Sequence, residues 1–330
     1  MAATQLDVDE LRARLAPFGA VDVAPLTGGA SSLTYSARVD GQRVAVKVAP
    51  PGLPPVLNRD VLRQARILRA LRATEVPVPE VLFEDGGDSP DVPPFFVMSF
   101  VEGASTEPLF DREPGGDEDD EDEDDAGTVA ERLRNATRTL AALHALDPVH
   151  LGLAGEPAVG PGDEIDRWHR LLDTVDPELA PGWPDAAASL RASEPAPVAA
   201  AVVHGDFRLG NLLAQGVAIT AVVDWEIWAV GDPRVDVGWF LVNADPETYG
   251  RDTRYAGALP SPAALLDVYA ALGRPVADMR WFEALACFKS TATWSLIVKH
   301  NRRRPEPDPE IEEIATTLPR LLERARDLVT

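Results

Sequence analysis

The stretch HGDFRLGNLLAQGVAITAVVDWE, residues 204–226, brings two carboxylates and an amide into a short part of the chain. Asp206 and Asn211 lie five residues apart in a loop that contains glycine, and Asp224 ends an apolar run rich in β-branched residues. Phosphoryl transfer needs an oriented nucleophile, metal ions that bridge the phosphates, and positive charge. Asp206 can accept the proton of an attacking hydroxyl, while Asn211 and Asp224 offer hard oxygen ligands for Mg²⁺. The pattern therefore predicts a phosphoryl-transfer loop.

Two neighbours of Asp206 have their own interpretations. Arg208 would point to the same side as Asp206 in an extended segment, where it could neutralise a phosphate during transfer. The pair His204 and Asp206 could also indicate a metal hydrolase, but the chain has five histidines and no His-rich cluster. We interpret His204 as a residue that packs and hydrogen-bonds structurally.

Composition narrows the class of protein. The 330 residues are 45% hydrophobic and 26% charged, which is typical of a globular protein with a sizeable core. A net charge of −23 argues against nucleic acid as a partner. The sequence has no run of 18 apolar residues, so we expect no membrane span, and its first residues do not resemble a secretory signal. With a single cysteine, Cys287, we expect a cytoplasmic protein; the sequence leaves its oligomeric state open.

The first part of the chain predicts a small sheet. Asp40-Gly41 between two alternating apolar runs is a hairpin signal. We expect five strands and one amphipathic helix, at 21–26, 33–39, 43–49, 76–84 and 93–103, with the helix at 56–73.

The later part is helical in pattern. Helices are expected near 129–146, 163–175, 185–193, 262–272, 278–300 and 308–329, with short strands on either side of the Asp206 loop. The prediction is an α+β fold with an N-lobe at 1–102 and a C-lobe at 103–330. An acidic loop at 111–127 contains DEDDEDEDD, residues 117–125, which predicts a solvated segment because like charges repel.

Two features of the N-lobe suit a nucleotide. The turn TGGASS, residues 27–32, has small side chains that let backbone N–H groups approach a phosphate. Lys47 is the first lobe's only lysine and lies between valines in VAVKVA, so its charge must face an anionic group or lose hydration at a cost.

These motifs resemble the aminoglycoside phosphotransferase and choline kinase-like group, which has a two-lobed protein-kinase-like fold. LTGGASSLTYSARV resembles its phosphate loop, VAVKV its ATP-lysine strand, and VPVPEVL with PPFFVMSFVEG the approach to its adenine hinge. VVHGDFRLGNLL and VVDWEIWAVGDPRVDVGWF resemble its catalytic and metal-binding signatures.

The resemblance implies ATP and Mg²⁺ as cofactors and assigns roles residue by residue. Asp206 would be the catalytic base with Arg208 beside it, Asn211 and Asp224 the metal ligands, and Lys47 the contact to the α- and β-phosphates. Nucleotide binding would also use Gly28, Gly29, Ser31 and Ser32, and the backbone of Met98, Ser99, Phe100 and Val101.

One departure leaves an alternative open. Where the family's helix carries a glutamate that pairs with the ATP lysine, this chain has Gln64, which cannot neutralise a lysine. Asp60, one turn earlier, could substitute if the register differs. The alternative is a nucleotide-binding, pseudokinase-like protein with little or no turnover.

The predicted acceptor is the hydroxyl group of a small molecule. Only 11 residues separate Asp224 from Asp236, which leaves no room for the long activation segment of a regulated protein kinase. Aminoglycosides, amino alcohols, macrolides and sugars all stay open. Asp236 is expected to tie the loop to a following helix, His144 to be a buried structural residue, and Trp168, Trp281 and Trp294 to pack in the core.

Overall fold

The computed structural model describes residues 6–26, 33–87, 92–108, 125–250, 253–255, 257–273 and 276–330. It divides into two compact units. The first comprises Met1–Ala104, Leu213–Gln215 and Ile219–Trp228, and the second Ser105–Leu212, Gly216–Ala218 and Ala229–Thr330. The predicted boundary after residue 102 lies two residues before this division. The prediction also placed Leu213–Gln215 and Ile219–Trp228 in the second lobe, whereas they cluster with the first unit.

Tertiary hydrogen bonds explain why those segments belong to the first unit. Val222 N donates to the Pro77 carbonyl at 2.8 Å. The Arg63 guanidinium stacks 3.9 Å from the centre of the Trp228 ring and donates to the Trp228 carbonyl at 2.8 Å. Contacts between residues so far apart in sequence leave no local pattern, so sequence periodicity could not reveal them.

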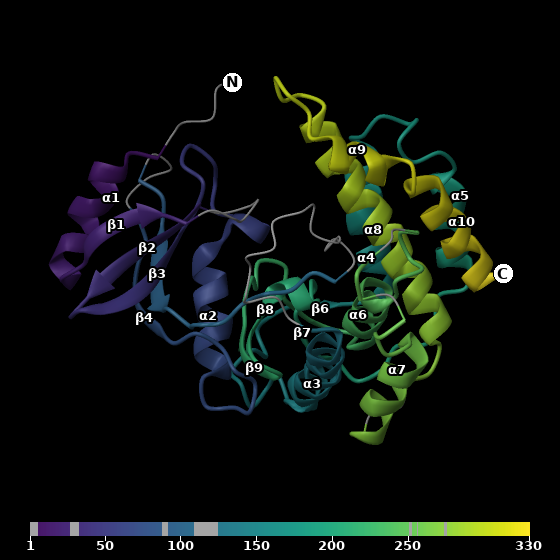
Figure 1. Ribbon diagram of the computed structural model, residues 1–330, viewed down its shortest axis with the longest axis horizontal. Coiled ribbons are helices and arrows are strands. Elements are labelled where there is room, and N and C mark those ends of the chain that lie inside the picture. The colour runs from purple at the N-terminus through teal and green to yellow at the C-terminus, as the bar shows by residue number, and fades with distance from the viewer. Residues whose placement is uncertain are drawn as a thin grey trace. The chain divides into compact units, whose positions relative to one another are not determined.

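The sheet of the first unit is antiparallel and five-stranded (Figure 1). Its strand order is β1-β2-β3-β5-β4. The strands are β1 (Val21–Pro25), β2 (Leu33–Val39), β3 (Gln42–Val48), β4 (Val81–Asp85) and β5 (Phe95–Ser99). Asp40 and Gly41 both have positive φ, +50° and +78°, as the predicted tight hairpin between β2 and β3 requires.

Alternation along β3 gives the sheet two different faces. Val44, Val46 and Val48 enter a buried cluster with Leu11 and Leu15 of α1 (Val8–Leu15). Lys47, between two of these valines, therefore points to the opposite face. The sequence pattern did not predict α1, a short helix whose N-cap Asp7 accepts from Asp9 N and Glu10 N.

The helix α2 (Val61–Leu71) lies on the other side of the sheet from α1 (Figure 1). It is shorter than the predicted 56–73 because a 3₁₀ turn, η2 (Leu57–Arg59), precedes it. Asp60 is its N-cap and accepts from Arg63 N at 3.0 Å. The Asp60 carboxylate thus caps the helix.

Helices make up most of the second unit. They are α3 (Ala126–Ala145), α4 (Pro161–Leu172), α5 (Trp183–Ala192), α6 (Arg234–Ala244), α7 (Pro262–Ala271), α8 (Met279–Asn301), α9 (Pro309–Ala315) and α10 (Leu318–Val329). The single helix predicted at 308–329 is wrong, because α9 ends at Ala315 and α10 begins at Leu318. Pro319 lies in the first turn of α10, where its missing N–H breaks no helical hydrogen bond.

Short strands and turns complete the structure. The second unit has a three-stranded sheet of β6 (Ala158–Val159), β10 (Ala229–Gly231) and β7 (Ala201–Val203). The strands β8 (Leu212–Gln215) and β9 (Ala218–Val222) form a hairpin, and η1 (Ala16–Phe18) and η3 (Leu209–Asn211) are 3₁₀ turns.

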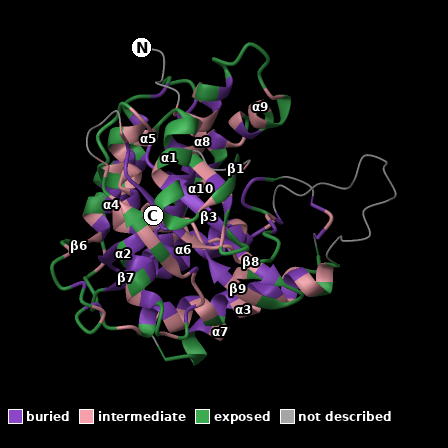
Figure 2. Ribbon diagram, turned by 90° about the vertical axis from the view of Figure 1, so that its left-hand side faces the viewer, coloured by how far each residue is buried: buried purple, intermediate pink, exposed green. Residues whose placement is uncertain are grey.

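The core of the second unit lies around α6 and α8. Every residue of α6 is buried, including Asp236 (Figure 2). Trp168 and Trp281 are buried as predicted, whereas Trp294 is half-buried. The small antiparallel sheet followed by helices confirms the predicted α+β class. Across the described residues, no helix is both long and apolar enough to cross a membrane.

The acidic run needs one correction. Residues 117–124 lie outside the described residues, but the predicted loop 111–127 extends too far. Ala126 and Gly127 already belong to α3, and Asp125 is its N-cap, accepting from Thr128 N at 2.8 Å. A short acidic side chain suits this position because it satisfies an unpaired amide and faces the positive end of the helix dipole.

Candidate active site

The Asp206 loop, residues 204–211, begins where β7 ends in the second unit. Asp236, in the first turn of α6, accepts from His204 N at 2.6 Å and Gly205 N at 2.7 Å. Gly205 has φ +85°, a conformation that favours glycine. The predicted structural role of Asp236 is confirmed: its carboxylate fixes the turn that presents Asp206.

Two histidines, His144 and His204, contact the Asp236 carboxylate. His144 Nε2 lies 3.3 Å from its Oδ2, and His144 is fully buried, as predicted. Burial alone would raise the pKa of Asp236, but hydrogen bonds from His144 and the His204 amide hold it below its ordinary value. His204 Nδ1 accepts from Asp206 N at 3.1 Å, which confirms its structural interpretation.

Two N–H donors orient the Asp206 carboxylate. Trp239 Nε1 donates to Oδ1 at 2.8 Å, and Asn211 Nδ2 donates to Oδ2 at 2.8 Å. Arg208 Nε lies 3.5 Å from Oδ2. The Asp206 side chain remains 25% exposed, so a carboxylate held in one orientation is still accessible to a bound hydroxyl.

Asn211 closes the loop at the end of η3. Its Nδ2 also donates to the Asp206 carbonyl at 2.8 Å, and the side chain is buried. Because the amide nitrogen donates both bonds, the amide oxygen is the atom that could bind a metal ion.

Arg208 has a carboxylate partner that the sequence did not indicate. Its Nη1 donates to Glu107 Oε2. Burial raises the pKa of Glu107, and the Arg208 charge opposes that rise. Gly210 permits the pair, because a Cβ there would meet both partners. Arg208 is therefore already ion-paired near Asp206.

Lys289 of α8 and Trp239 of α6 also contact the Asp206 loop, and the sequence did not indicate either residue. The Lys289 ammonium donates to the Gly205 carbonyl and lies 3.7 Å from the centre of the Trp239 ring. Burial lowers its pKa to about 8, against the opposing effect of carboxylates that include Asp206. Lys289 is one of only three lysines beside 28 arginines and lies in the apolar stretch ALACFKSTATW, which was the available signal.

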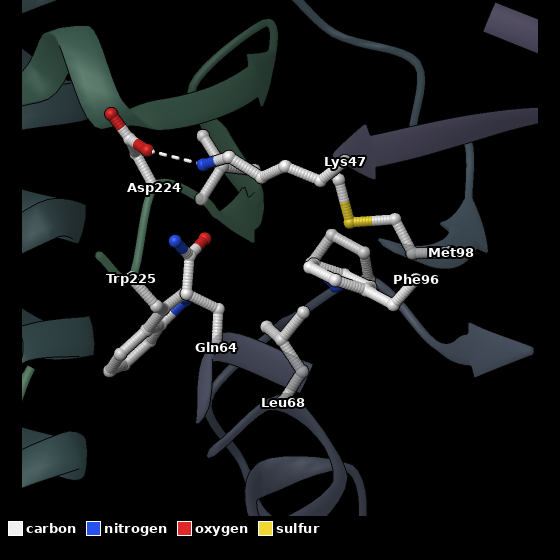
Figure 3. Close-up of a pocket in the computed structure, with 9 residues that line it drawn as sticks. Lys47, Gln64, Leu68, Phe96, Met98, Asp224 and Trp225 are labelled. Carbon is white, nitrogen blue, oxygen red and sulfur yellow. Dashed lines mark hydrogen bonds and ion pairs between the residues drawn. The ribbon is translucent and has the colours of Figure 1, made fainter. Parts of the chain in front are cut away.

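In the first unit, Lys47 and Asp224 form an ion pair (Figure 3). The distance between Lys47 Nζ and Asp224 Oδ1 is 2.6 Å. The Lys47 side chain is 10% exposed and that of Asp224 is 34% exposed. The two residues line one pocket with Gln64, Phe96 and Met98, on the face of the sheet opposite the valine cluster.

Backbone geometry brings Asp224 to Lys47. Asp224 follows β9 with φ +64°, a left-handed conformation that aspartate tolerates better than most residues. The indole of Trp225 donates to the Val222 carbonyl at 2.9 Å and closes this turn. The carboxylate thereby lies in the pocket rather than continuing along the strand.

Gln64 lines the same pocket but is not the charge partner of Lys47 (Figure 3). It is 2% exposed, and its Nε2 lies 3.5 Å from the Asn58 carbonyl. Asp224 supplies the negative charge that the family's glutamate would bring, so the lysine has an anionic partner despite the neutral amide.

The predicted nucleotide contacts fall into two groups. Gly28, Gly29, Ser31 and Ser32 lie outside the described residues. Met98 and Ser99 end β5, and Phe100 and Val101 follow it. Ser99 N donates to the Glu80 carbonyl at 2.8 Å and Phe100 N to the Arg43 carbonyl at 3.4 Å. These two amide groups are therefore already hydrogen-bonded within the first unit.

A unit built on an antiparallel sheet and a largely helical unit are the two parts of the protein-kinase-like fold. Solved structures share the fold: a candidate aminoglycoside phosphotransferase of Ralstonia eutropha matches with a TM-score of 0.76, 22% identity and 98% coverage of both chains. Macrolide 2'-phosphotransferase MphH of Brachybacterium faecium matches with a TM-score of 0.57 and 20% identity, covering 94% of this chain and 97% of its own.

The model of the phosphotransferase enzyme family matches residues 22–285, and the chain belongs to this family. Membership confirms both the predicted resemblance and the predicted class of enzyme.

Curated relatives add two comparisons. Viomycin phosphotransferase of Streptomyces vinaceus is 29% identical over 200 residues, which are 57% of this chain and 64% of that protein. Acyl-CoA dehydrogenase family member 11 of Gallus gallus is 27% identical over 294 residues, which are 83% of this chain and 36% of that protein. The chain thus spans about a third of the length of this longer relative.

Proposed function

We propose that this enzyme transfers the γ-phosphoryl group of ATP, with Mg²⁺, to a hydroxyl group of a small molecule. The observation that carries the proposal is the Asp206 carboxylate, which receives one N–H on each oxygen and stays partly exposed. A carboxylate held in this way can orient an acceptor hydroxyl and take its proton during transfer.

The first unit would hold the nucleotide. Lys47 presents a nearly buried ammonium group to the pocket, and its cation would pair with the α- and β-phosphates. The turn of Gly28, Gly29, Ser31 and Ser32 and the backbone at 98–101 would contact the phosphates and the base. In support, solved structures of the fold neighbour APH(4)-Ia include ternary complexes with ADP or AMP-PNP and hygromycin B.

Mg²⁺ would be bound by the Asn211 amide oxygen and the Asp224 carboxylate. Among the described residues, no group of three or more His, Cys, Asp or Glu side chains could hold a metal ion. Two protein ligands fit the usual binding of Mg²⁺, which takes its other ligands from substrate phosphates and water. When bound, the ion neutralises charge on the phosphates.

The acceptor class follows from the relatives only in outline. Viomycin phosphotransferase and macrolide 2'-phosphotransferase are named for small-molecule acceptors, and APH(4)-Ia has been solved in complex with hygromycin B. Amino alcohols and sugars remain in the same acceptor set. The alternative function, nucleotide binding with little turnover, rests on Gln64 in place of a glutamate; the Lys47–Asp224 ion pair argues against it, because Lys47 has an anionic partner without that glutamate.

The test is a panel of hydroxyl acceptors incubated with the enzyme and Mg·ATP. Gain of one phosphoryl group by an acceptor, measured by mass spectrometry and abolished in Asp206→Asn, is the expected result. Saturable binding of Mg·ATP without transfer to any acceptor of the panel would support the non-catalytic alternative instead.

A further inference from the structure

A line of three side chains runs from α8 to the Asp206 carboxylate. Lys289 Nζ lies 3.7 Å from the centre of the Trp239 ring, and Trp239 Nε1 donates to Asp206 Oδ1 at 2.8 Å. The Trp168 ring lies 5.3 Å from the same ammonium. All of these residues belong to the second unit.

The contact between Lys289 and Trp239 should strengthen the hydrogen bond to Asp206. Indole is the aromatic ring that attracts cations best, and the attraction grows when the cation is desolvated. A cation over the ring face draws electron density from the indole and makes its N–H a stronger donor. In a low-dielectric interior, polarisation of this kind passes from one group to the next.

The same lysine also fixes the backbone beside Asp206. Its ammonium donates to the Gly205 carbonyl, while Gly205 N donates to Asp236. Both peptide groups that flank the Gly205 α-carbon are therefore anchored. A buried ammonium is costly in free energy unless it is paired. The burial of Lys289 at this position therefore suggests that the residue has a function that offsets the cost.

We propose that Trp239 and Lys289 are positioning residues of the phosphoryl-transfer reaction, which hold the Asp206 carboxylate in the orientation that receives the acceptor's proton. The inference rests on the proposed function, because proton acceptance is the work assigned to Asp206. Neither residue needs to touch a substrate.

The test compares matched variants. Trp239→Phe keeps a ring and removes the N–H, whereas Lys289→Met keeps a long side chain and removes the charge. Trp281→Phe is the control for the indole, because Trp281 is buried on α8 and donates to the Leu190 carbonyl. Lys299→Met is the control for the lysine, because Lys299 lies in the last turn of the same helix.

We expect kcat to fall about tenfold in Trp239→Phe, in line with the loss of one hydrogen bond to a charged group. The affinity for Mg·ATP and the acceptor KM should change little. Trp281→Phe should lower the melting temperature, because it removes a buried hydrogen bond, while kcat should stay at the wild-type value. Because Lys289 acts partly through the indole, the Trp239→Phe, Lys289→Met double variant should lose less than the product of the single losses.

Three results would overturn the inference. One is a wild-type kcat in Trp239→Phe. Another is a loss of kcat in Trp281→Phe equal to that in Trp239→Phe, which would indicate a general effect of lost packing. The third is full additivity in the double variant. If the wild-type enzyme phosphorylated no acceptor, the proposed function would fail first, and the two failures are thus distinguishable.

Discussion

Lys47 and Asp224 are 177 residues apart in the sequence and form a 2.6 Å ion pair in the first unit. The pair joins the strand that carries the only lysine of this lobe to the segment after β9. A nearly buried ammonium thereby gains an anionic partner, which offsets its loss of hydration.

Lys47→Ala should weaken Mg·ATP binding and leave the fold of the first unit intact. Alanine removes the cation that would meet the phosphates and leaves the Asp224 carboxylate at a site that is 34% exposed, where water can solvate it. The measurement is a thermal-shift titration, because a ligand that binds only the native state raises its stability. Arg38→Ala, at an exposed position of β2, is the matched control. No stabilisation of the wild-type protein by Mg·ATP would contradict the assigned nucleotide site.

Asp206→Asn and Asp224→Asn should fail in different ways. Asp206→Asn should lower turnover by roughly 10²–10⁴-fold, as is usual when a positioned base is removed, with ATP affinity little changed. Asp224→Asn should weaken Mg·ATP binding as well as turnover, because it removes the charge of a proposed Mg²⁺ ligand. Nucleotide affinity and acceptor phosphorylation measured on both variants separate the two roles. Full activity in Asp206→Asn would refute the mechanism.

The acidic run should separate into a dispensable part and a helix cap. Deletion of residues 117–124 should change the free energy of unfolding by no more than roughly 0.5 kcal/mol, as is usual at surface sites. Asp125→Ala should cost about 1 kcal/mol, because Asp125 caps α3. Chemical denaturation of the two variants measures both values. No change in the free energy of unfolding in Asp125→Ala would show that the cap bond to Thr128 N contributes nothing.

The charge of Lys289 should make stability depend on pH. Its pKa in the folded protein is about 8, below the ordinary 10.5, so between these values the unfolded chain binds a proton that the native state lacks. The free energy of unfolding contributed by this group therefore rises as pH increases from about 8, because a buried charge is relieved. The carboxylates of Asp206, Glu164 and Asp236 and the Arg167 cation face the group.

The measurement is the difference in unfolding free energy between wild type and Lys289→Met from pH 7 to 9.5. Taking the difference removes the contributions of groups that both proteins share. One of these is the buried Cys287 thiol, whose pKa is raised to about 12, so that its contribution to stability falls as pH rises. The unfolding free energy of the wild-type protein should rise relative to that of Lys289→Met as the pH increases above 8. A difference that stays constant would show that Lys289 does not titrate there.

Much of the fold was accessible from local patterns. Alternation in β3 and the Asp40-Gly41 turn predicted the central hairpin, and the spacing of Asp206 and Asn211 predicted two side chains that the structure brings together. Local patterns did not predict the exact ends of several helices or the contacts between residues far apart in the sequence. α1 is only eight residues long, too short for a clear periodic signal. Trp239 and Lys289 reach the Asp206 loop across 33 and 84 residues of sequence, a separation over which periodicity carries no information.

The place of Asp236 has a consequence for any search for inactive variants. This carboxylate is fully buried and accepts hydrogen bonds from the backbone amides of His204 and Gly205, the two residues before Asp206. Its loss would leave two amide donors without a partner in the core of the second unit and release the loop at the same moment. Folding yield and catalytic competence are therefore inseparable at this position. In a mutational scan, substitutions of Asp236 should be recovered as insoluble protein, whereas those of Asp206 should be recovered as soluble, inactive enzyme.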